Sequence, residues 1–138
     1  MALEPKQYES LARLRYGLRR FLAYSERLTR AAGVTSTQYQ ALLAIKAWPD
    51  GRMSIKALAE QLLLKHNAAV QLVNRLAAAG LAARHPCHED RRTVLLALTP
   101  KGGVLVDELA SNHLRGLLGQ ESLLAESLER LRDLGPPA

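Results

Sequence analysis

The feature that most constrains the fold is a pair of short helical patterns separated by very few residues. Apolar residues at helical spacing predict one helix over residues 55–62, with Ser54 as its N-cap. A second helix is predicted over residues 67–79, with Gly80 as its C-terminal stop. Two helices joined by so short a turn form a helix-turn-helix, a unit whose second helix can enter the major groove of DNA.

A β-hairpin is predicted directly after this helix pair. Residues 81–85 and 93–98 have the pattern of two short strands, and the residues between them are charged and turn-forming. A helix pair followed by such a hairpin is a winged helix-turn-helix. The expected fold class is therefore mainly α with a small β-hairpin wing.

Further helices are predicted on both sides of this centre. A long helix runs through residues 11–28, and the capping box of Thr35 and Gln38 opens another helix that stops near Pro49. Thr99 and Pro100 open a third, and residues 122–134 form the last. The terminal helices are too apolar to stand alone, so we expect two copies to pair through them as a homodimer.

The positive charge is concentrated around the predicted helix-turn-helix and in the first helix. The net charge is +6, and residues 52–92 carry seven Lys/Arg against three Asp/Glu, as do residues 1–30. Residues 101–138 carry four against six. This distribution predicts a polyanionic partner for the centre of the chain.

Several classes of protein are disfavoured. No apolar run approaches the roughly 20 residues of a membrane helix, so we expect a cytoplasmic protein with no membrane partner. Cys87 is the sole cysteine, which excludes an intrachain disulfide and a Cys-based zinc site within one chain. The sequence has no phosphate-binding glycine loop and no nucleophile with a paired base. We therefore predict a protein that is not an enzyme and has no cofactor or metal.

A set of short motifs in fixed order resembles the MarR (multiple antibiotic resistance regulator) family of transcription regulators. The motifs are Leu-Ala-Glu-Gln-Leu at 58–62, Ala-Gly-Leu at 79–81, Glu-Asp-Arg-Arg at 89–92 and Leu-Thr-Pro-Lys-Gly at 98–102. The resemblance implies a homodimer that binds double-stranded DNA at a pseudopalindromic operator, usually as a repressor. It also implies one domain over 1–138, in which 35–99 form the DNA-binding lobe and 1–34 with 100–138 the dimerisation region.

The resemblance also assigns roles to individual residues. The recognition helix would place six residues in the major groove: Lys65, His66, Asn67, Ala68, Gln71 and Arg75. The wing would place Arg91 and Arg92 in a minor groove, with Asp90 orienting an arginine, and Ser54 and Arg84 would contact the DNA backbone. The chemistry agrees independently, because Asn and Gln can pair with adenine, Ala can touch a thymine methyl, and a guanidinium suits a narrow minor groove.

The chain departs from the family in three places. Position 63 is Leu where the family commonly has Gly, and position 65 is Lys where it has a small capping residue. The recognition helix can therefore start near Lys65 or be capped by Asn67. Cys87 replaces a residue that is usually acidic or polar in the family.

Other interpretations remain open for several residues. Cys87 is either a filler of the wing or a redox-sensitive thiol, although the sensing cysteine of such relatives usually lies near the N-terminus. His66, His85 and His88 show no helical ligand spacing, which argues against a metal site. A small aromatic or phenolic effector is a further expected partner, with four aromatic candidates for its pocket: Tyr16, Tyr24, Tyr39 and Trp48. The alternative function is a winged-helix protein-interaction module that does not bind DNA.

Overall fold

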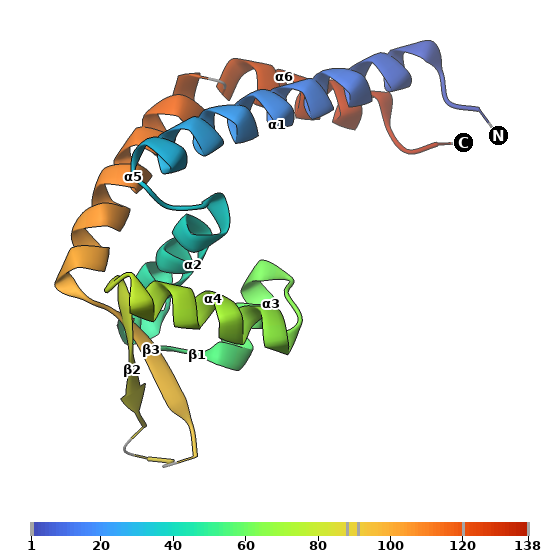
Figure 1. Ribbon diagram of the computed structural model, residues 1–138. Helices are drawn as coiled ribbons and strands as arrows, with labels where there is room; N and C mark the ends of the chain where they lie inside the picture. The colour runs from blue at the N-terminus through green and yellow to red at the C-terminus, as the bar shows by residue number, and fades with distance from the viewer. Residues whose placement is uncertain (1, 88, 91, 120, 138) are drawn as a thin grey trace. The chain divides into compact units, whose positions relative to one another are not determined.

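The computed structural model describes residues 2–87, 89–90, 92–119 and 121–137, with only the backbone described for residues 121–123 (Figure 1). In chain order the helices and strands are α1 (Pro5–Ala31), α2 (Ser36–Ala47), the 3-10 turn η1 (Pro49–Gly51), β1 (Met53–Ser54), α3 (Ile55–Leu62), α4 (His66–Ala78), β2 (Ala82–Pro86), β3 (Val94–Leu98), α5 (Pro100–Gly119) and α6 (Glu121–Leu134). The fold is mainly helical with a small antiparallel sheet, which confirms the predicted class. In the part of the chain that the structure describes, no helix is both long and apolar enough to cross a bilayer.

The helix starts follow the local signals in the sequence. The amide of Gln38 donates to Thr35 Oγ1 at 3.0 Å and the amide of Thr35 donates to Gln38 Oε1 at 2.8 Å, so the capping box that opens α2 is complete. The hydroxyl of Ser54 accepts from the amide of Ala57 at 3.1 Å and caps α3. Both caps confirm the prediction, because each is made within four residues of chain.

Contacts between residues divide the chain into two units. Unit 1 comprises the described residues of 1–28 and 112–138, and unit 2 comprises Thr29–Ser111. Unit 2 therefore includes the first part of α5 as well as the predicted lobe of residues 35–99. The reason is that Val106 and Leu109 are 1% and 2% exposed and belong to the core of that unit.

The core of unit 2 lies between its helices and the sheet. Its largest fully buried apolar side chains are Leu42, Ile45, Met53, Leu58, Leu76, Leu96, Val73 and Val106. The sheet has the order β1-β3-β2, with both pairings antiparallel. Strand β1 was not predicted, because a strand of two residues is too short to show an alternating pattern.

The beginning of α5 is fastened to the end of α4. The Thr99 hydroxyl donates to the Gly80 carbonyl at 2.6 Å, and the Thr99 amide donates to the Leu81 carbonyl at 3.1 Å. A Cβ atom on Gly102 would overlap the backbone of Leu81, so only glycine fits at this position. This contact gives a physical reason for the Leu-Thr-Pro-Lys-Gly motif.

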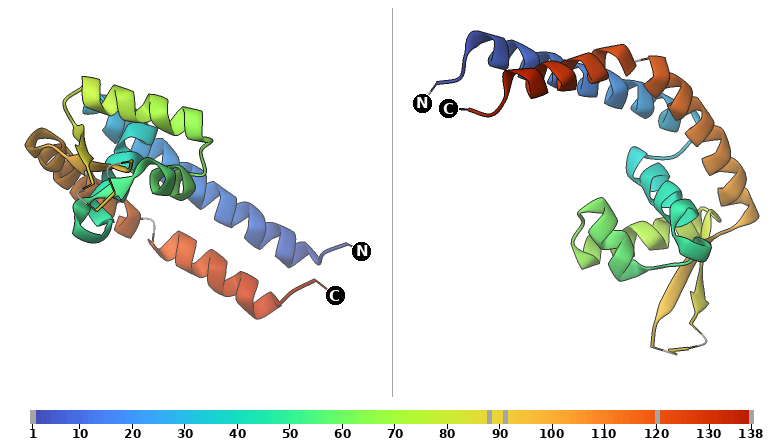
Figure 2. Two further views of the ribbon diagram at one scale, coloured as in Figure 1. Left: turned by 90° about the horizontal axis from the view of Figure 1, so that it is seen from below. Right: turned by 180° about the vertical axis from the view of Figure 1, so that it is seen from behind.

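Unit 1 is held by polar contacts between α1 and the C-terminal helices. Ser25 Oγ and His113 Nε2 lie 2.6 Å apart, and both side chains are buried. The Tyr24 hydroxyl donates to the Asn112 carbonyl at 3.0 Å. At the other end, Gln7 Nε2 donates to the Gly135 carbonyl at 3.3 Å, where α1 and α6 lie side by side in both views of Figure 2.

Candidate nucleic-acid interface

Helix α4 has one buried face and one exposed face. Ala69, Leu72, Val73 and Leu76 are at most 6% exposed and anchor the helix to the core of unit 2. All six residues predicted for the major groove are exposed: Lys65, His66, Asn67, Ala68, Gln71 and Arg75. Because Asn67, Gln71 and Arg75 follow one another at intervals of four, they lie along one line of the helix. The exposed face of α4 therefore combines amide groups, which are able to pair with bases, and cations, which are able to bind phosphate.

The turn before α4 is made by a residue in an unusual conformation. Leu63 ends α3 with φ 55° and ψ 40°, which is the left-handed region that favours glycine. Its side chain is 93% exposed, so no packing of the side chain offsets the strain. Amide-to-carbonyl bonds from Leu63 to Glu60 and from Leu64 to Ala59 close the turn at 3.3 and 2.9 Å. The departure at position 63 thus changes the residue but keeps the turn.

Helix α4 begins at His66, with Lys65 as its N-cap. Of the two predicted alternatives, the start near Lys65 is therefore confirmed and the cap at Asn67 is not, and the Lys65 side chain makes no capping bond. The physical reason is the turn: the Lys65 carbonyl already accepts from the Ala69 amide at 3.1 Å, which places Asn67 inside the first turn. The unused amides of this turn point out of the N-terminal end of α4, where a phosphate oxygen can accept from them.

The C-terminal half of α4 is linked to the wing by Arg84. In β2, this arginine donates through a terminal nitrogen to Asn74 Oδ1 at 2.5 Å. The contact of Arg84 with the DNA backbone stays a prediction, and in the structure this arginine ties the hairpin to α4. Asn74 was not among the predicted site residues, because nothing local in the sequence indicates that positions 74 and 84 meet.

The hairpin of β2 and β3 projects from unit 2 and carries the wing tip (Figure 1). Asp90 organises this tip, since its Oδ1 accepts from the Arg92 amide at 2.9 Å and its Oδ2 from the Thr93 hydroxyl at 3.1 Å. Asp90 therefore contacts Arg92, one of the two arginines of the predicted wing, through the backbone amide. Arg92 is exposed. Arg91 and His88 lie outside the described residues.

The remaining predictions concern Cys87, a metal site and the four aromatic residues. The Cys87 amide donates to the Thr93 carbonyl at 3.0 Å, which places this half-buried cysteine where the hairpin enters its tip. Among the described residues, no cluster of three His, Cys, Asp or Glu side chains could hold a metal ion. Tyr16 and Tyr24 belong to unit 1, whereas Tyr39 and Trp48 belong to unit 2. Tyr39 is 4% exposed, and this burial raises the pKa of its phenol.

The fold and the interface together define a winged helix-turn-helix protein. The MarR family matches residues 32–93, from the end of α1 into the wing. The organic hydroperoxide resistance transcriptional regulator of Bacillus subtilis (strain 168) is 32% identical over 99 residues, 72% of this chain and 65% of that protein. The HTH-type transcriptional repressor MdtR of the same strain is 29% identical over 101 residues, 73% of this chain and 59% of that protein.

A solved structure agrees over nearly the whole chain. AbsC from Streptomyces coelicolor, a MarR family transcriptional regulator, matches with a TM-score of 0.80 and 22% sequence identity, covering 99% of this chain and 94% of AbsC. The chain belongs to the MarR family. It spans less than two thirds of the length of either Bacillus subtilis relative.

Proposed function

We propose that the protein is a sequence-specific transcription regulator that binds double-stranded DNA as a homodimer and represses from a pseudopalindromic operator. The observation that carries this proposal is the exposed line of Asn67, Gln71 and Arg75 on α4 beside a hairpin that presents Arg92. The amides suit base edges in the major groove, and the arginines suit phosphates or a minor groove. Such a surface supports a binding protein rather than an enzyme.

The proposed dimer is supported by the apolar surface of unit 1. Seven leucine and tyrosine side chains of unit 1 are about half exposed: Tyr8, Leu11, Tyr16, Leu22, Leu114, Leu118 and Leu128. Exposed apolar residues in this number mark a surface that another protein covers. A second copy of the same face would bury it with twofold symmetry and present two copies of α4 to successive major grooves.

Repression is supported by one relative, MdtR, which is a transcriptional repressor. A dimer that occupies a promoter can block transcription without any further activity. We therefore place the protein with repressors rather than activators.

The test is selection of bound duplexes from a random pool, followed by titration of variants on the selected duplex at several salt concentrations. Gln71→Ala should relax discrimination at one base pair by about 1–3 kcal/mol. Arg92→Ala should weaken binding to every duplex and reduce the salt slope by about 1. Gln61→Ala on α3 and Arg13→Ala on α1 are matched controls that should leave both properties unchanged.

Failure to bind any duplex at low salt would overturn the proposal. Tight and salt-insensitive capture of a protein partner in the same preparation would instead support the alternative, a winged-helix interaction module. Binding that Arg13→Ala weakens as much as Arg92→Ala would show that general positive charge, and not the wing, provides the affinity.

A further inference from the structure

Helix α1 carries three arginines that the proposed operator interface does not use. Arg13, Arg20 and Arg27 follow one another at intervals of seven residues, or two helical turns, so they lie along one line of α1 over about 21 Å. All three side chains are exposed, and none forms an ion pair with a carboxylate in the part of the chain that the structure describes. We call these three residues the arginine row.

The arginine row lies on the side of α1 that points away from its exposed leucines. Arg13 is two positions from Leu11, and Arg20 is two positions from both Leu18 and Leu22. Residues two apart point about 200° from each other around a helix, so they lie on opposite sides of it. A dimer that covers the leucines of α1 therefore leaves the arginine row in solvent.

Two guanidinium groups of the row are held by tyrosine rings of the same helix. The Cζ atom of Arg20 lies 5.8 Å from the centroid of the Tyr16 ring, and that of Arg27 lies 5.9 Å from the centroid of the Tyr24 ring. A stacked guanidinium keeps the N–H donors at its edge available to an acceptor. The rings therefore position two cations and leave their donors for a ligand.

The ring under Arg27 is itself fixed by α5. The Tyr24 hydroxyl donates to the Asn112 carbonyl at 3.0 Å, and a Cβ atom on Gly116 would overlap the ring, so only glycine fits there. A hollow of about 370 Å³ lies beside this ring, and both Arg20 and Arg27 line it. No carboxylate is among its lining residues in the described part of unit 1.

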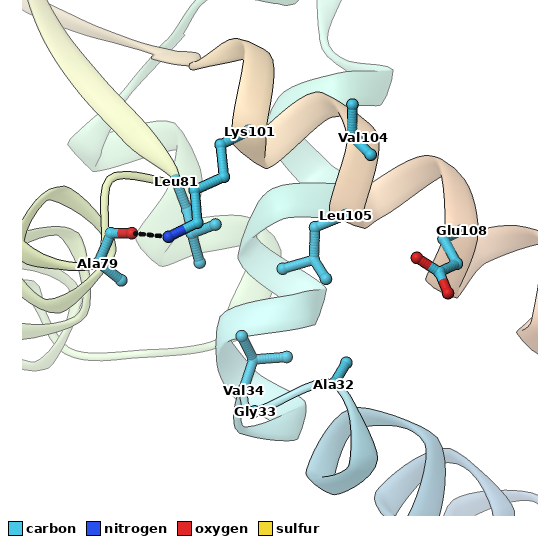
Figure 3. A pocket seen from close by; sticks show the side chains of 9 residues that line it. All are labelled: Ala32, Gly33, Val34, Ala79, Leu81, Lys101, Val104, Leu105 and Glu108. Atoms are coloured by element: carbon cyan, nitrogen blue, oxygen red, sulfur yellow. Dashed lines mark hydrogen bonds between the residues drawn. The ribbon is translucent and has the colours of Figure 1, made fainter.

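A cavity of unit 2 makes the difference in charge clear. This cavity of about 460 Å³ beside α5 is lined by both Lys101 and Glu108 (Figure 3). Its cation is already engaged, because Lys101 Nζ donates to the Ala79 carbonyl at 3.1 Å. The arginine row, by contrast, has cations without a neighbouring carboxylate in its hollow.

The residue types along the row favour phosphate as the partner. Residues 10–25 carry four arginines and no Asp or Glu, and residues 10–28 include no Asn or Gln. Guanidinium groups bind phosphate through two parallel hydrogen bonds, whereas base edges in the major groove are read largely by amides and bidentate side chains aimed into it. A span of about 21 Å exceeds the width of roughly 12 Å of the major groove, so the row can reach phosphates on both sides of a groove.

We propose that the arginine row binds the sugar-phosphate backbone of a second DNA duplex, whatever its sequence, while α4 and the wing hold the operator. One dimer then presents two copies of the row and bridges two segments of DNA. The bridging rests on the proposed function, but the binding of a duplex by the row does not. Contacts to phosphate alone give a Kd of about 1 μM or weaker, so the row does not contribute to operator titrations at nanomolar concentrations.

The row is tested first without an operator. The background variant combines Arg75→Gln and Arg92→Gln, which removes the two arginines of the proposed operator interface. Fluorescence anisotropy at low salt measures its binding to a labelled duplex of arbitrary sequence. Adding Arg13→Gln, Arg20→Gln and Arg27→Gln should weaken this binding about ten-fold or more. The salt slope should fall by about 3–5, since each phosphate contact contributes about 0.9.

Two matched variants in the same background separate the row from general charge. Replacing all three arginines of the row by lysine keeps the charge and should keep the affinity within about three-fold. Lys46→Gln, Arg115→Gln and Arg132→Gln together remove the same charge from exposed positions on α2, α5 and α6, and should also leave the affinity within about three-fold. Sedimentation velocity checks that every variant keeps the oligomeric state of the wild type.

Bridging is measured separately on beads that carry the selected duplex. Wild-type protein loaded on these beads should capture a labelled second duplex of unrelated sequence at micromolar concentration. The variant with glutamine at all three positions of the row should load the beads equally and capture at least about five-fold less. Equal capture by both proteins would overturn the bridging. If no operator is found while the anisotropy series loses binding with the row, the proposed function fails and the row stands.

The anisotropy series also distinguishes other anionic partners. Equal binding of the duplex with and without the arginine row overturns the proposal. Tighter binding of one strand of the same sequence, or of polyglutamate, than of the duplex would assign the row to that anion and overturn the choice of duplex DNA.

Discussion

Units 1 and 2 differ in what they bury. Every buried apolar side chain in the described part of the chain belongs to unit 2, from Tyr39 to Leu109. In unit 1 the buried side chains are polar: Ser10, Ser25, His113 and Ser127. Many of its large apolar side chains are instead exposed, with Leu22 and Leu118 both at 58%. Unit 2 has an apolar core of its own, whereas unit 1 lacks one within a single chain.

This difference indicates where each unit obtains its stability. Burial of apolar surface is the main favourable contribution to folding, and small cores stabilise a domain only marginally. The helices of unit 1 therefore need a further apolar surface to cover their leucines and tyrosines, and the second copy of the proposed dimer would provide it. The recognition helix, by contrast, is anchored within one chain through Leu72, Val73 and Leu76.

The largest expected effect comes from breaking the proposed dimer through unit 1. Leu22→Glu places a charge on the exposed apolar surface and should separate the subunits, because a buried unpaired charge is strongly unfavourable. A single subunit retains one recognition helix, so affinity for the selected duplex should fall by about 10²–10⁴-fold. Sedimentation velocity and duplex titration measure the two effects.

The matched control for this change is Leu43→Glu on α2. Leu43 is 40% exposed but belongs to unit 2, so this variant should remain dimeric. A dimer of Leu22→Glu as tight as the wild type would show that the exposed surface of unit 1 is not the contact.

The next effect separates a core residue from a surface residue of the same type. Leu76 is fully buried in unit 2, and Leu76→Ala should lower the free energy of unfolding by about 2–5 kcal/mol through the cavity that it leaves. Leu118→Ala should lower the stability of the dimer at high protein concentration, and its cost should shrink on dilution, because Leu118 is already 58% exposed in a separated subunit. Urea unfolding of both variants at several protein concentrations tests this. Identical concentration dependence would contradict the assignment of Leu118 to an interface.

The smallest effect is a gain in stability at the turn before α4. Leu63→Gly removes the strain of a left-handed leucine and loses no packing, since the side chain is 93% exposed. The gain of about 1–2 kcal/mol from relief of strain is reduced by the greater freedom of glycine in the unfolded chain, so we expect less than about 1 kcal/mol. Thermal unfolding measures it, with Leu63→Ala as the control that keeps the strain. A lower melting temperature for Leu63→Gly would mean that the leucine has a partner.

The helix-turn-helix and its caps could be predicted because their signals are local. Thr35 and Gln38, or Ser54 and Ala57, are three residues apart, so their hydrogen bonds depend on little beyond the chain between them. The fold class and the exposed face of α4 follow in the same way from the spacing of apolar residues. For the DNA roles of these exposed residues, the sequence and the structure support a prediction that the duplex titrations will test.

Contacts between residues distant in sequence could be found only in the tertiary structure. Examples are the bond from Arg84 to Asn74, the pairing of Met53 with Leu96, and the approach of Gly102 to Leu81. From the sequence alone, the helices, the hairpin, the turn before α4 and the residue types available for DNA could be predicted. Only the folded chain shows which carboxylates, amides and cations already have partners, such as Asp90 and Arg84. The physical reason is that a helical period or a cap depends on neighbours within about one turn, whereas a partner from another element depends on how the whole core packs.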